Sequence, residues 1–192
     1  MLNWEALSQQ CMSCTKCELC KTRTNVVFGV GPRNADIMFV GEGPGEQEDL
    51  QGEPFVGAAG KLLDDMLSII DLGRHNCYIA NIVKCRPPRN RDPQEEEQEA
   101  CISYLRNQVA LIRPKIIVCL GRVAAKKLID PDFRITQQHG NWFCSNGVWM
   151  TAIYHPSALL RDLSKRPETF DDLLSIREKY KEVHADLGVQ ND

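Results

Sequence analysis

Six cysteines in this chain have a spacing that suits metal binding. Four form an unbroken run with two residues between successive members, and two lie far along the chain: Cys11, Cys14, Cys17, Cys20, Cys85 and Cys101. A three-residue step on a regular helix turns about 300°, so the four local cysteines cannot all face one metal from a helix. One local pair together with Cys85 and Cys101 would complete a four-thiolate site. Zinc and iron–sulfur clusters both accept such ligands, and the spacing alone does not separate them.

The remaining cysteines and the start of the chain bear on where the protein works. The total of nine cysteines is odd, so complete pairing is impossible. The segment from Met1 to Leu7 has no basic or apolar stretch typical of a secretory signal. We therefore expect a cytoplasmic protein that does not enter a membrane, in which thiols stay reduced and bind metal. Cys119, in an apolar run, is expected in the core, and no role is predicted for Cys77 or Cys144.

Three further sets of chemically useful residues follow apolar, strand-like runs. They are the Gly41–Gly45 turn, Asn81 near the end of its run, and the His155–Ser157 turn. Ligands of open parallel sheets bind beyond the carboxyl ends of the strands. We therefore expect these three sets to share one edge of a sheet.

The elements that must position these residues alternate along the chain, which is typical of an α/β domain. The expected strands are Val26–Phe28, Ile37–Val40, Tyr78–Val83, Ile116–Leu120 and Val148–Tyr154. The expected helices are Gly60–Ile70, Pro93–Ile112, Arg122–Ile129, a polar helix at about 170–185 and a short helix from Leu2 to about Gln10. Asp92 is expected to cap the Pro93 helix, with Pro93 at its first position.

Length and composition set the outer limits. The chain has 192 residues, 43% of them apolar and 26% charged, with a net charge of -3. These values are ordinary for a soluble globular protein. They exclude a surface coated in positive charge, but not a local basic face. We expect a single domain over 1–192, with a metal-binding segment at about 11–20.

Several motifs together resemble the family 4 uracil-DNA glycosylases. The first motif of that family is matched by Gly41–Asp49 and Gly52–Gly57, and the central motif by Tyr78–Pro88 with Asn90, Arg91 and Pro93. The closing motif, shared more widely among uracil-DNA glycosylases, is matched by His155–Arg161. The similarity runs in order and spacing from about Cys14 to Arg161, which makes it specific.

The resemblance implies a fold and a cofactor. The fold would be a single α/β/α domain with a central, mostly parallel sheet of about four strands. The cofactor would be a structural [4Fe–4S] cluster on Cys14, Cys17, Cys85 and Cys101, leaving Cys11 and Cys20 without a role.

The resemblance also implies the activity, which is hydrolysis of the bond between uracil and deoxyribose in DNA to leave an abasic site. In that reaction the base is flipped out of the helix and leaves with negative charge on O2. His155 would stabilise this charge. Asn81 would accept from uracil N3–H and donate to O4. Phe55 would stack on the base.

The water-activating group is the open part of this mechanism. Many uracil-DNA glycosylases place an aspartate where Gly43 stands, whereas family 4 and this chain lack it. Glu42 or Glu48 would partly replace it, although Glu48 is equally suited to a structural role in the loop. The backbone amides of Glu42 and Gly43 can approach the base or water, because glycine removes side-chain bulk.

DNA contacts are expected from the closing motif and from a local run of arginines. Leu159 would fill the gap left by the flipped base, and Ser157 lies in the same motif. The expected phosphate contacts are Arg161, Lys84, Arg86, Arg89 and Arg91, with uracil-containing single- or double-stranded DNA as partner of a monomer. No lysine is placed for a Schiff base, which predicts a monofunctional enzyme.

The alternative function is a non-catalytic iron–sulfur DNA-binding or redox-sensing protein on the same fold. The joint presence of Asn81, Phe55 and His155 argues against it. A covalent uracil-trapping relative is disfavoured because no histidine follows Asn81 in the 84–88 segment. A small-molecule enzyme is disfavoured because no nucleotide-phosphate motif is complete.

Overall fold

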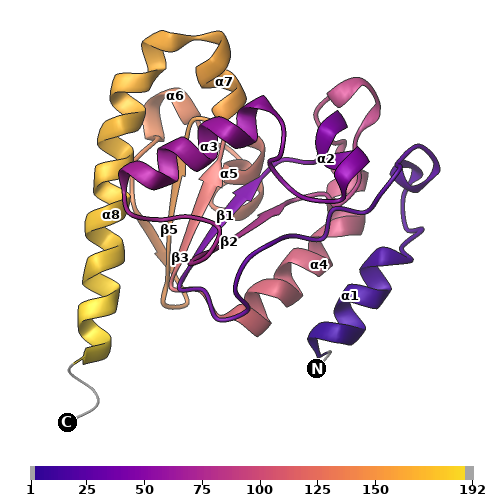
Figure 1. Cartoon of the computed structure of the whole chain (residues 1–192), viewed down its shortest axis with the longest axis horizontal. Coiled ribbons are helices and arrows are strands. Elements are labelled where there is room, and N and C mark those ends of the chain that lie inside the picture. The colour runs from indigo at the N-terminus through magenta and orange to yellow at the C-terminus, as the bar shows by residue number, and fades with distance from the viewer. Residues whose placement is uncertain (1–2, 189–192) are drawn as a thin grey trace.

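The computed structural model describes residues 3–188, which form a five-stranded sheet with helices on both faces (Figure 1). The strand order is β2-β1-β3-β5-β4. Four strands run parallel, namely β1 (Ile37–Gly41), β2 (Cys77–Asn81), β3 (Ile116–Leu120) and β5 (Val148–Ile153), and β4 (Phe143–Ser145) is antiparallel at one edge. This confirms the expected α/β, mostly parallel fold, with one more strand than the four expected.

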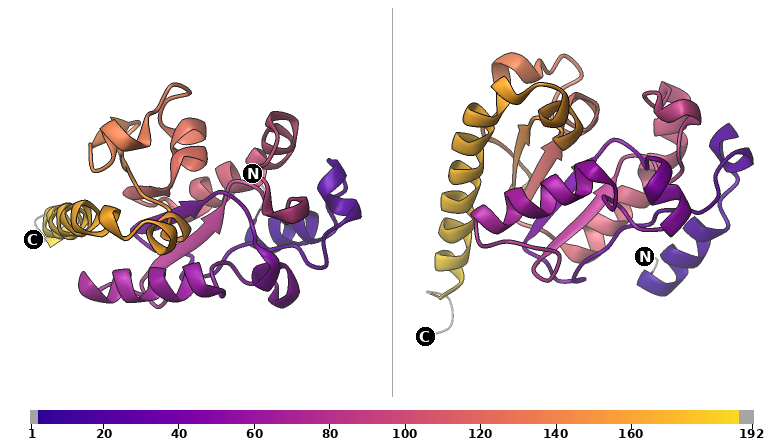
Figure 2. Two further views of the ribbon diagram at one scale, coloured as in Figure 1. Left: turned by 90° about the horizontal axis from the view of Figure 1, so that it is seen from above. Right: turned by 45° about the horizontal axis from the view of Figure 1, so that its top comes forward.

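Strands β1, β2 and β3 are buried along their whole length, which explains why their sequences are continuous apolar runs. Alternate residues enter two separate cores. Ile37 and Phe39 face one side together with α3 (Ala58–Ile69) and α8 (Arg166–Gly188). Met38 and Val40 face the other side with α4 (Glu95–Ile112), α5 (Arg122–Leu128) and α1 (Trp4–Met12). Figure 2 shows α3 and α5 on opposite sides of the sheet.

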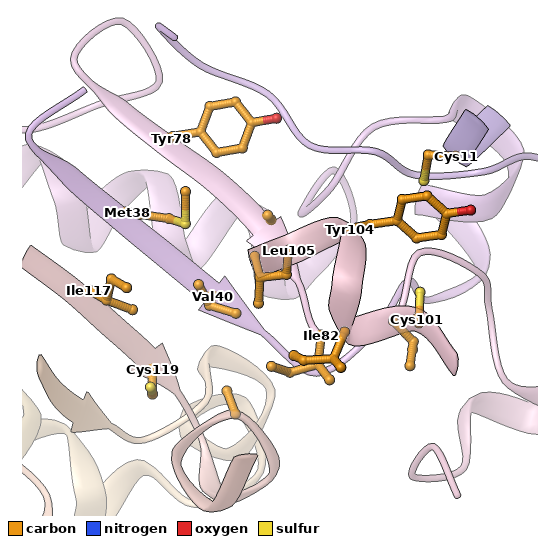
Figure 3. Close-up of a cluster of buried hydrophobic side chains, with 14 of the residues drawn as sticks. Cys11, Met38, Val40, Tyr78, Ile82, Cys101, Tyr104, Leu105, Ile117 and Cys119 are labelled. Atoms are coloured by element: carbon orange, nitrogen blue, oxygen red, sulfur yellow. The ribbon is translucent and has the colours of Figure 1, made fainter. Parts of the chain in front are cut away.

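The second core extends from the sheet to the cysteines. Figure 3 shows Met38, Val40 and Ile117 on the strands, with Leu105 of α4 packed against them. The same cluster contains Cys11 at the end of α1 and Cys101 of α4. Buried apolar contacts therefore join the N-terminal segment to the sheet. Cys119 lies in this core, as the sequence predicts.

The remaining helical elements are short. They are α2 (Glu46–Gln51), α6 (Ile135–Gln138), α7 (Pro156–Arg161) and the 3-10 turns η1 (Glu18–Lys21), η2 (Pro88–Asn90) and η3 (Leu163–Lys165).

Two sequence predictions about strands are wrong. Val26–Phe28 is not a strand. Gly29 and Gly31, with φ of 140° and 132°, follow it, and this part of the chain pairs with the sheet only through a bridge from Val30 to Ile79. The strand β4 was missed, although Asn146 and Gly147 are a strong hairpin signal. Both have positive φ, 51° and 79°, as a tight turn between β4 and β5 requires.

The predicted start of α4 is also wrong. The helix begins at Glu95 with Gln94 as its N-cap, and the Gln94 amide donates to Glu97 Oε2 at 2.8 Å. Asp92 does not cap the helix, because its carboxylate instead pairs with Arg122 of α5.

Candidate active site

A cleft of about 570 Å³ lies at the carboxyl ends of four strands. Its lining comes from the loops after β1, β2 and β3 and from the His155–Ser157 turn after β5. The cleft brings together three side chains singled out from the sequence, Phe55, Asn81 and His155. The prediction that the three sets of residues share one edge is therefore confirmed.

Asn81 ends β2 and carries an unsatisfied acceptor. The residue is only 2% exposed, and its Oδ1 has no hydrogen-bond partner within residues 3–188. An unpaired buried carbonyl costs about 1–3 kcal/mol. Gly41, its register partner on β1, makes room for it, because a Cβ there would lie 2.5 Å from Asn81 Oδ1 and 2.6 Å from Phe55 Cζ. The site therefore presents an acceptor that only a bound donor can satisfy.

Phe55 lies next to His155 across the cleft. The two ring centroids are 5.6 Å apart, with 33° between their planes. Phe55 has φ of 56°, a left-handed conformation that strains any residue with a Cβ. The Phe55 ring thus lies beside the His155 imidazole. Contacts with the surrounding structure must hold the Phe55 backbone in its strained conformation.

His155 is a neutral hydrogen-bond donor in this structure. Burial, reinforced by nearby Arg161 and opposed by Glu48, lowers the pKa of His155 to about 4. The Ser157 backbone amide donates to Nδ1 at 3.1 Å. Since Nδ1 must accept, the proton of the neutral ring is on Nε2. His155 can therefore donate from Nε2 at neutral pH without carrying charge.

The two glutamates of the first motif, Glu42 and Glu48, have different environments. Glu48 Oε1 accepts from the amides of Val56 and Gly57 at 2.8 and 2.9 Å, so it fixes the chain just after Phe55. Glu42 lines the cleft beside Gly43. Burial and Asp92 raise the pKa of Glu42 to about 7, against the opposing effect of nearby arginines. Glu42 is thus suited to exchange protons near neutral pH.

A second, enclosed cavity lies beside the cleft-forming loops and is lined by all six spaced cysteines: Cys11, Cys14, Cys17, Cys20, Cys85 and Cys101. All nine cysteines of the chain are free thiols. Burial raises the pKa of Cys101 to about 11 and that of Cys11 to about 12. In the part of the chain that the structure describes, no three ligand side chains meet around a single ion position.

Two cationic side chains, Arg23 and Lys84, line the same cavity. Arg23 Nη1 donates to Cys85 Sγ at 3.2 Å. Lys84 is only 1% exposed; its ammonium donates to Gln108 Oε1 at 2.8 Å, and its backbone amide donates to Cys101 Sγ at 3.3 Å. A buried ammonium bonded to a neutral amide is costly unless an anion lies nearby. The positive charges of Arg23 and Lys84 therefore suit the cavity to an anionic group.

Known proteins are similar to this chain over most of its length. Residues 28–176 match the Uracil DNA glycosylase superfamily. The type-4 uracil-DNA glycosylase of Archaeoglobus fulgidus is 49% identical over 93% of this chain and 94% of its own length. The chain belongs to the type-4 uracil-DNA glycosylases. The type-4 uracil-DNA glycosylase of Thermotoga maritima is 46% identical over 83% of this chain and 84% of its own length. That of Sulfurisphaera tokodaii is 45% identical over 91% of this chain and 83% of its own length.

Two of the DNA contacts predicted from the sequence, Lys84 and Leu159, are wrong because both side chains are buried. Lys84 cannot reach a phosphate as predicted, because its side chain points into the core beside the cysteines. Leu159 cannot fill a gap in DNA, because it is 2% exposed and packs in the α3 and α8 core. The next residue, Leu160, is 43% exposed. One position along α7 separates a core leucine from a surface leucine.

Of the other predicted contacts, three line the cleft and two, Arg86 and Arg89, do not. Ser157 and Arg161 line the cleft. Arg91 also lines it, although both its terminal nitrogens donate to Glu97, at 2.8 and 2.6 Å. Arg86 lies outside the lining and donates to Asn90 Oδ1 at 2.8 Å.

Several residues that line the cleft were not predicted from the sequence, and two of them, Asp92 and Arg122, are charged. Asp92 and Arg122 both line it and pair with each other. Arg122 had an available signal, since it follows Gly121 at the end of β3. Among the described helices, none is long and apolar enough to cross a membrane.

Proposed function

We propose that this protein flips uracil out of DNA and hydrolyses its N-glycosidic bond, leaving an abasic site. Family membership supports the reaction, and the cleft supplies the groups it needs. The observation that carries the proposal is the unpartnered Asn81 Oδ1. Uracil presents a donor at N3, whereas cytosine presents an acceptor there, so this oxygen favours uracil.

His155 stabilises the leaving base. Its Nε2–H donates to uracil O2, where negative charge develops as the bond to the sugar breaks. A neutral donor suits this role because it does not protonate the base before the bond breaks. Phe55 stacks on the base, and the backbone amides at Glu42 and Gly43 approach from the adjoining turn.

Glu42 activates the water that attacks the sugar. Its raised pKa matches a general base near neutral pH. Glu48 has a structural role, because it accepts hydrogen bonds from the amides of Val56 and Gly57 and so holds the loop that carries Phe55. No lysine is among the cleft-lining residues that the structure describes, which supports a monofunctional enzyme without a lyase step.

The protein works as a cytoplasmic monomer on single- or double-stranded DNA. Ser157, Arg161, Arg86 and Arg91 contact the backbone, and affinity falls as salt rises. The exposed Leu160, not Leu159, enters the space vacated by the base.

These two leucines separate DNA insertion from packing. Leu160→Ala is expected to slow excision from double-stranded DNA more than from single strands, with an unchanged melting temperature. Leu159→Ala is the matched control and should cost about 2–5 kcal/mol of folding stability. Equal excision by wild type and Leu160→Ala on a duplex would contradict the insertion role.

Cys14, Cys17, Cys85 and Cys101, which line the cysteine cavity, would hold a [4Fe–4S] cluster. The thiol donor set suits it, and Arg23 and Lys84 fit an anionic cluster. Its four cysteine ligands would join the N-terminal segment to Cys85 and Cys101. The cluster would therefore have a structural role and take no part in bond cleavage.

The deciding assay is release of free uracil from a uracil-containing oligonucleotide. Wild type is expected to release uracil and leave an abasic site. Asn81→Asp offers a carboxyl that can be protonated to donate to cytosine N3, so it is expected to gain release of cytosine. A folded wild-type protein that releases no uracil would overturn the proposal.

A further inference from the structure

The backbone around Phe55 is held by contacts outside the cleft. The residue keeps a left-handed φ of 56° while its ring is packed against the site. A chain free to relax would leave this conformation and carry the ring away from His155. The groups that hold its peptide units therefore decide where the stacking surface lies.

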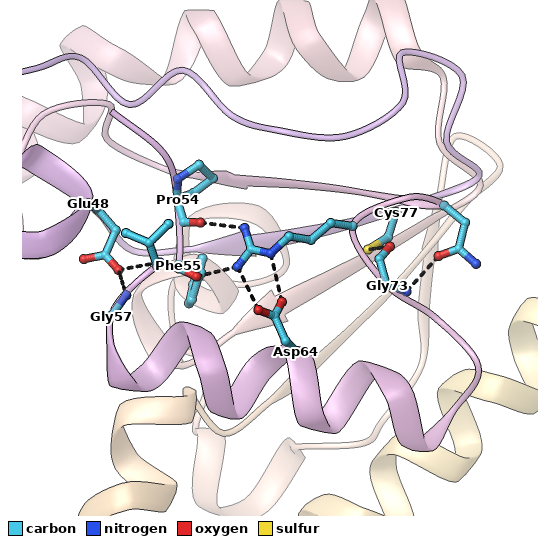
Figure 4. A network of polar contacts seen from close by, with 10 residues as sticks. Glu48, Pro54, Phe55, Gly57, Asp64, Gly73 and Cys77 are labelled. Carbon is cyan, nitrogen blue, oxygen red and sulfur yellow. Dashed lines mark hydrogen bonds and ion pairs between the residues drawn. The ribbon is translucent and has the colours of Figure 1, made fainter. Parts of the chain in front are cut away.

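Arg74, in the loop between α3 and β2, holds the two carbonyls at this point. Its Nη1 donates to the Pro54 carbonyl at 2.9 Å, and its Nη2 donates to the Phe55 carbonyl (Figure 4). The guanidinium is itself oriented by Asp64 of α3, which accepts from Nε at 2.9 Å. Three separate nitrogens in one plane allow it to bind two carbonyls and a carboxylate together, whereas a lysine has a single nitrogen that cannot occupy all three positions.

The remaining sides of the same peptide are also fixed. α3 approaches so closely that a Cβ at Gly60 would lie 1.8 Å from the Phe55 carbonyl oxygen. The amides of Val56 and Gly57 are bound by Glu48. Arg74 thus completes an enclosure in which carbonyls are held on one side of Phe55 and amides on the other.

We propose that Arg74 is a positioning residue for base recognition, which acts by holding the Pro54 and Phe55 carbonyls so that the Phe55 ring stays in stacking position. The inference rests on the proposed function. Arg74 does not line the cleft, so its effect on the base is transmitted through Phe55.

A double-mutant cycle tests this. Arg74→Met keeps the apolar stem and removes the donors; it is expected to lower kcat/KM for uracil-containing DNA by about 10- to 100-fold. The same change in a Phe55→Ala background is expected to add little, because the ring it positions is gone. Binding to abasic DNA, which lacks the base, should not change.

Three further variants serve as controls for this cycle. Arg74→Lys is expected to recover only part of the activity, because it cannot bind both carbonyls. Arg177→Met on α8 removes an arginine of similar exposure, 33% against 28% for Arg74, and should leave kcat/KM unchanged. Should Arg74→Met not fold, Asp64→Asn loosens the guanidinium and is expected to give a smaller loss that again vanishes without Phe55.

The outcomes separate the two hypotheses. An inactive wild type overturns the proposed function and this inference with it. An active wild type in which the Arg74 and Phe55 effects multiply independently, or in which abasic DNA binding falls equally, overturns the positioning role alone.

Discussion

The proposed base-recognition groups of the cleft and the groups around the cysteine cavity differ in charge. The two polar groups proposed to recognise the base, the Asn81 carbonyl and His155, are both neutral. The cysteine cavity places the cations Arg23 and Lys84 against sulfur. A neutral base would be selected by the direction of its hydrogen bonds, whereas the anionic cluster proposed for the cysteine cavity would be held by charge. The difference explains how recognition and anchoring can stand side by side without competing for one ligand.

The largest expected effect is in the cleft. His155→Ala removes the donor to uracil O2 and should reduce single-turnover uracil release by about 10²–10³-fold. Iron content should match wild type, since the cysteine cavity is untouched, whereas the melting temperature should fall somewhat because His155 caps α7. Loss of iron in this variant would break the separation between the two regions.

Cys85→Ala is the counterpart in the cysteine cavity. It should abolish the visible absorption of the purified protein and lower its melting temperature, because a metal site that forms only in the folded chain contributes to folding. Cys144→Ala, at an exposed cysteine outside the cavity, is the matched control. Retention of full absorption by Cys85→Ala would remove this residue from the ligand set.

Lys84→Met tests whether charge holds the cluster. The loaded protein should lose iron faster to a chelator, whereas the iron-free protein should be as stable as wild type or more so, because a buried ammonium is gone. The gap between the loaded and iron-free melting temperatures should therefore narrow. Lys21→Met, at an exposed surface ion pair, is the control. An unchanged gap would contradict the role of charge.

The smallest expected effect is a change of pH profile. Since burial and Asp92 raise the pKa of Glu42 to about 7, its carboxylate forms as pH rises through that value. Activity should increase about tenfold per pH unit below 7, and Glu42→Gln should remove this slope. The sign for stability is opposite: between its ordinary 4.5 and about 7 the folded state keeps a proton, so the free energy of unfolding falls as pH rises. A Glu42→Gln profile identical to wild type would exclude Glu42 as the base.

The sequence predicted the sheet well where strands are buried on both faces. Ile37–Val40 and Ile116–Leu120 are continuous apolar runs, and both match strands to within one residue. It failed for β4, which is three residues long and largely exposed, and so lacks that pattern. It also failed for Val26–Phe28, a part of the chain that pairs with the sheet only through the bridge from Val30 to Ile79.

The candidate site divides in the same way. Asn81 and His155 follow strands, so parallel topology alone brings them to one edge. Lys84 and Leu159 were misjudged because side-chain direction after a strand, or on one helical turn, depends on packing that no local pattern records. Asp92 was misjudged because the helix begins later than predicted, with Gln94 as its N-cap, and because Arg122 was available as its partner.

The segment after β2 has a consequence for how this chain can vary. Only Ile82, Val83 and Lys84 lie between Asn81 and Cys85, and the first two donate backbone bonds to the carbonyls of Gly41 and Glu42 at 2.9 and 3.1 Å. The Lys84 carbonyl in turn accepts from Val27. Each of the three residues is held by a backbone hydrogen bond, so the length of the segment is fixed. A side chain here can be exchanged for another of similar size, but an insertion or deletion of one residue would displace either Asn81 or Cys85.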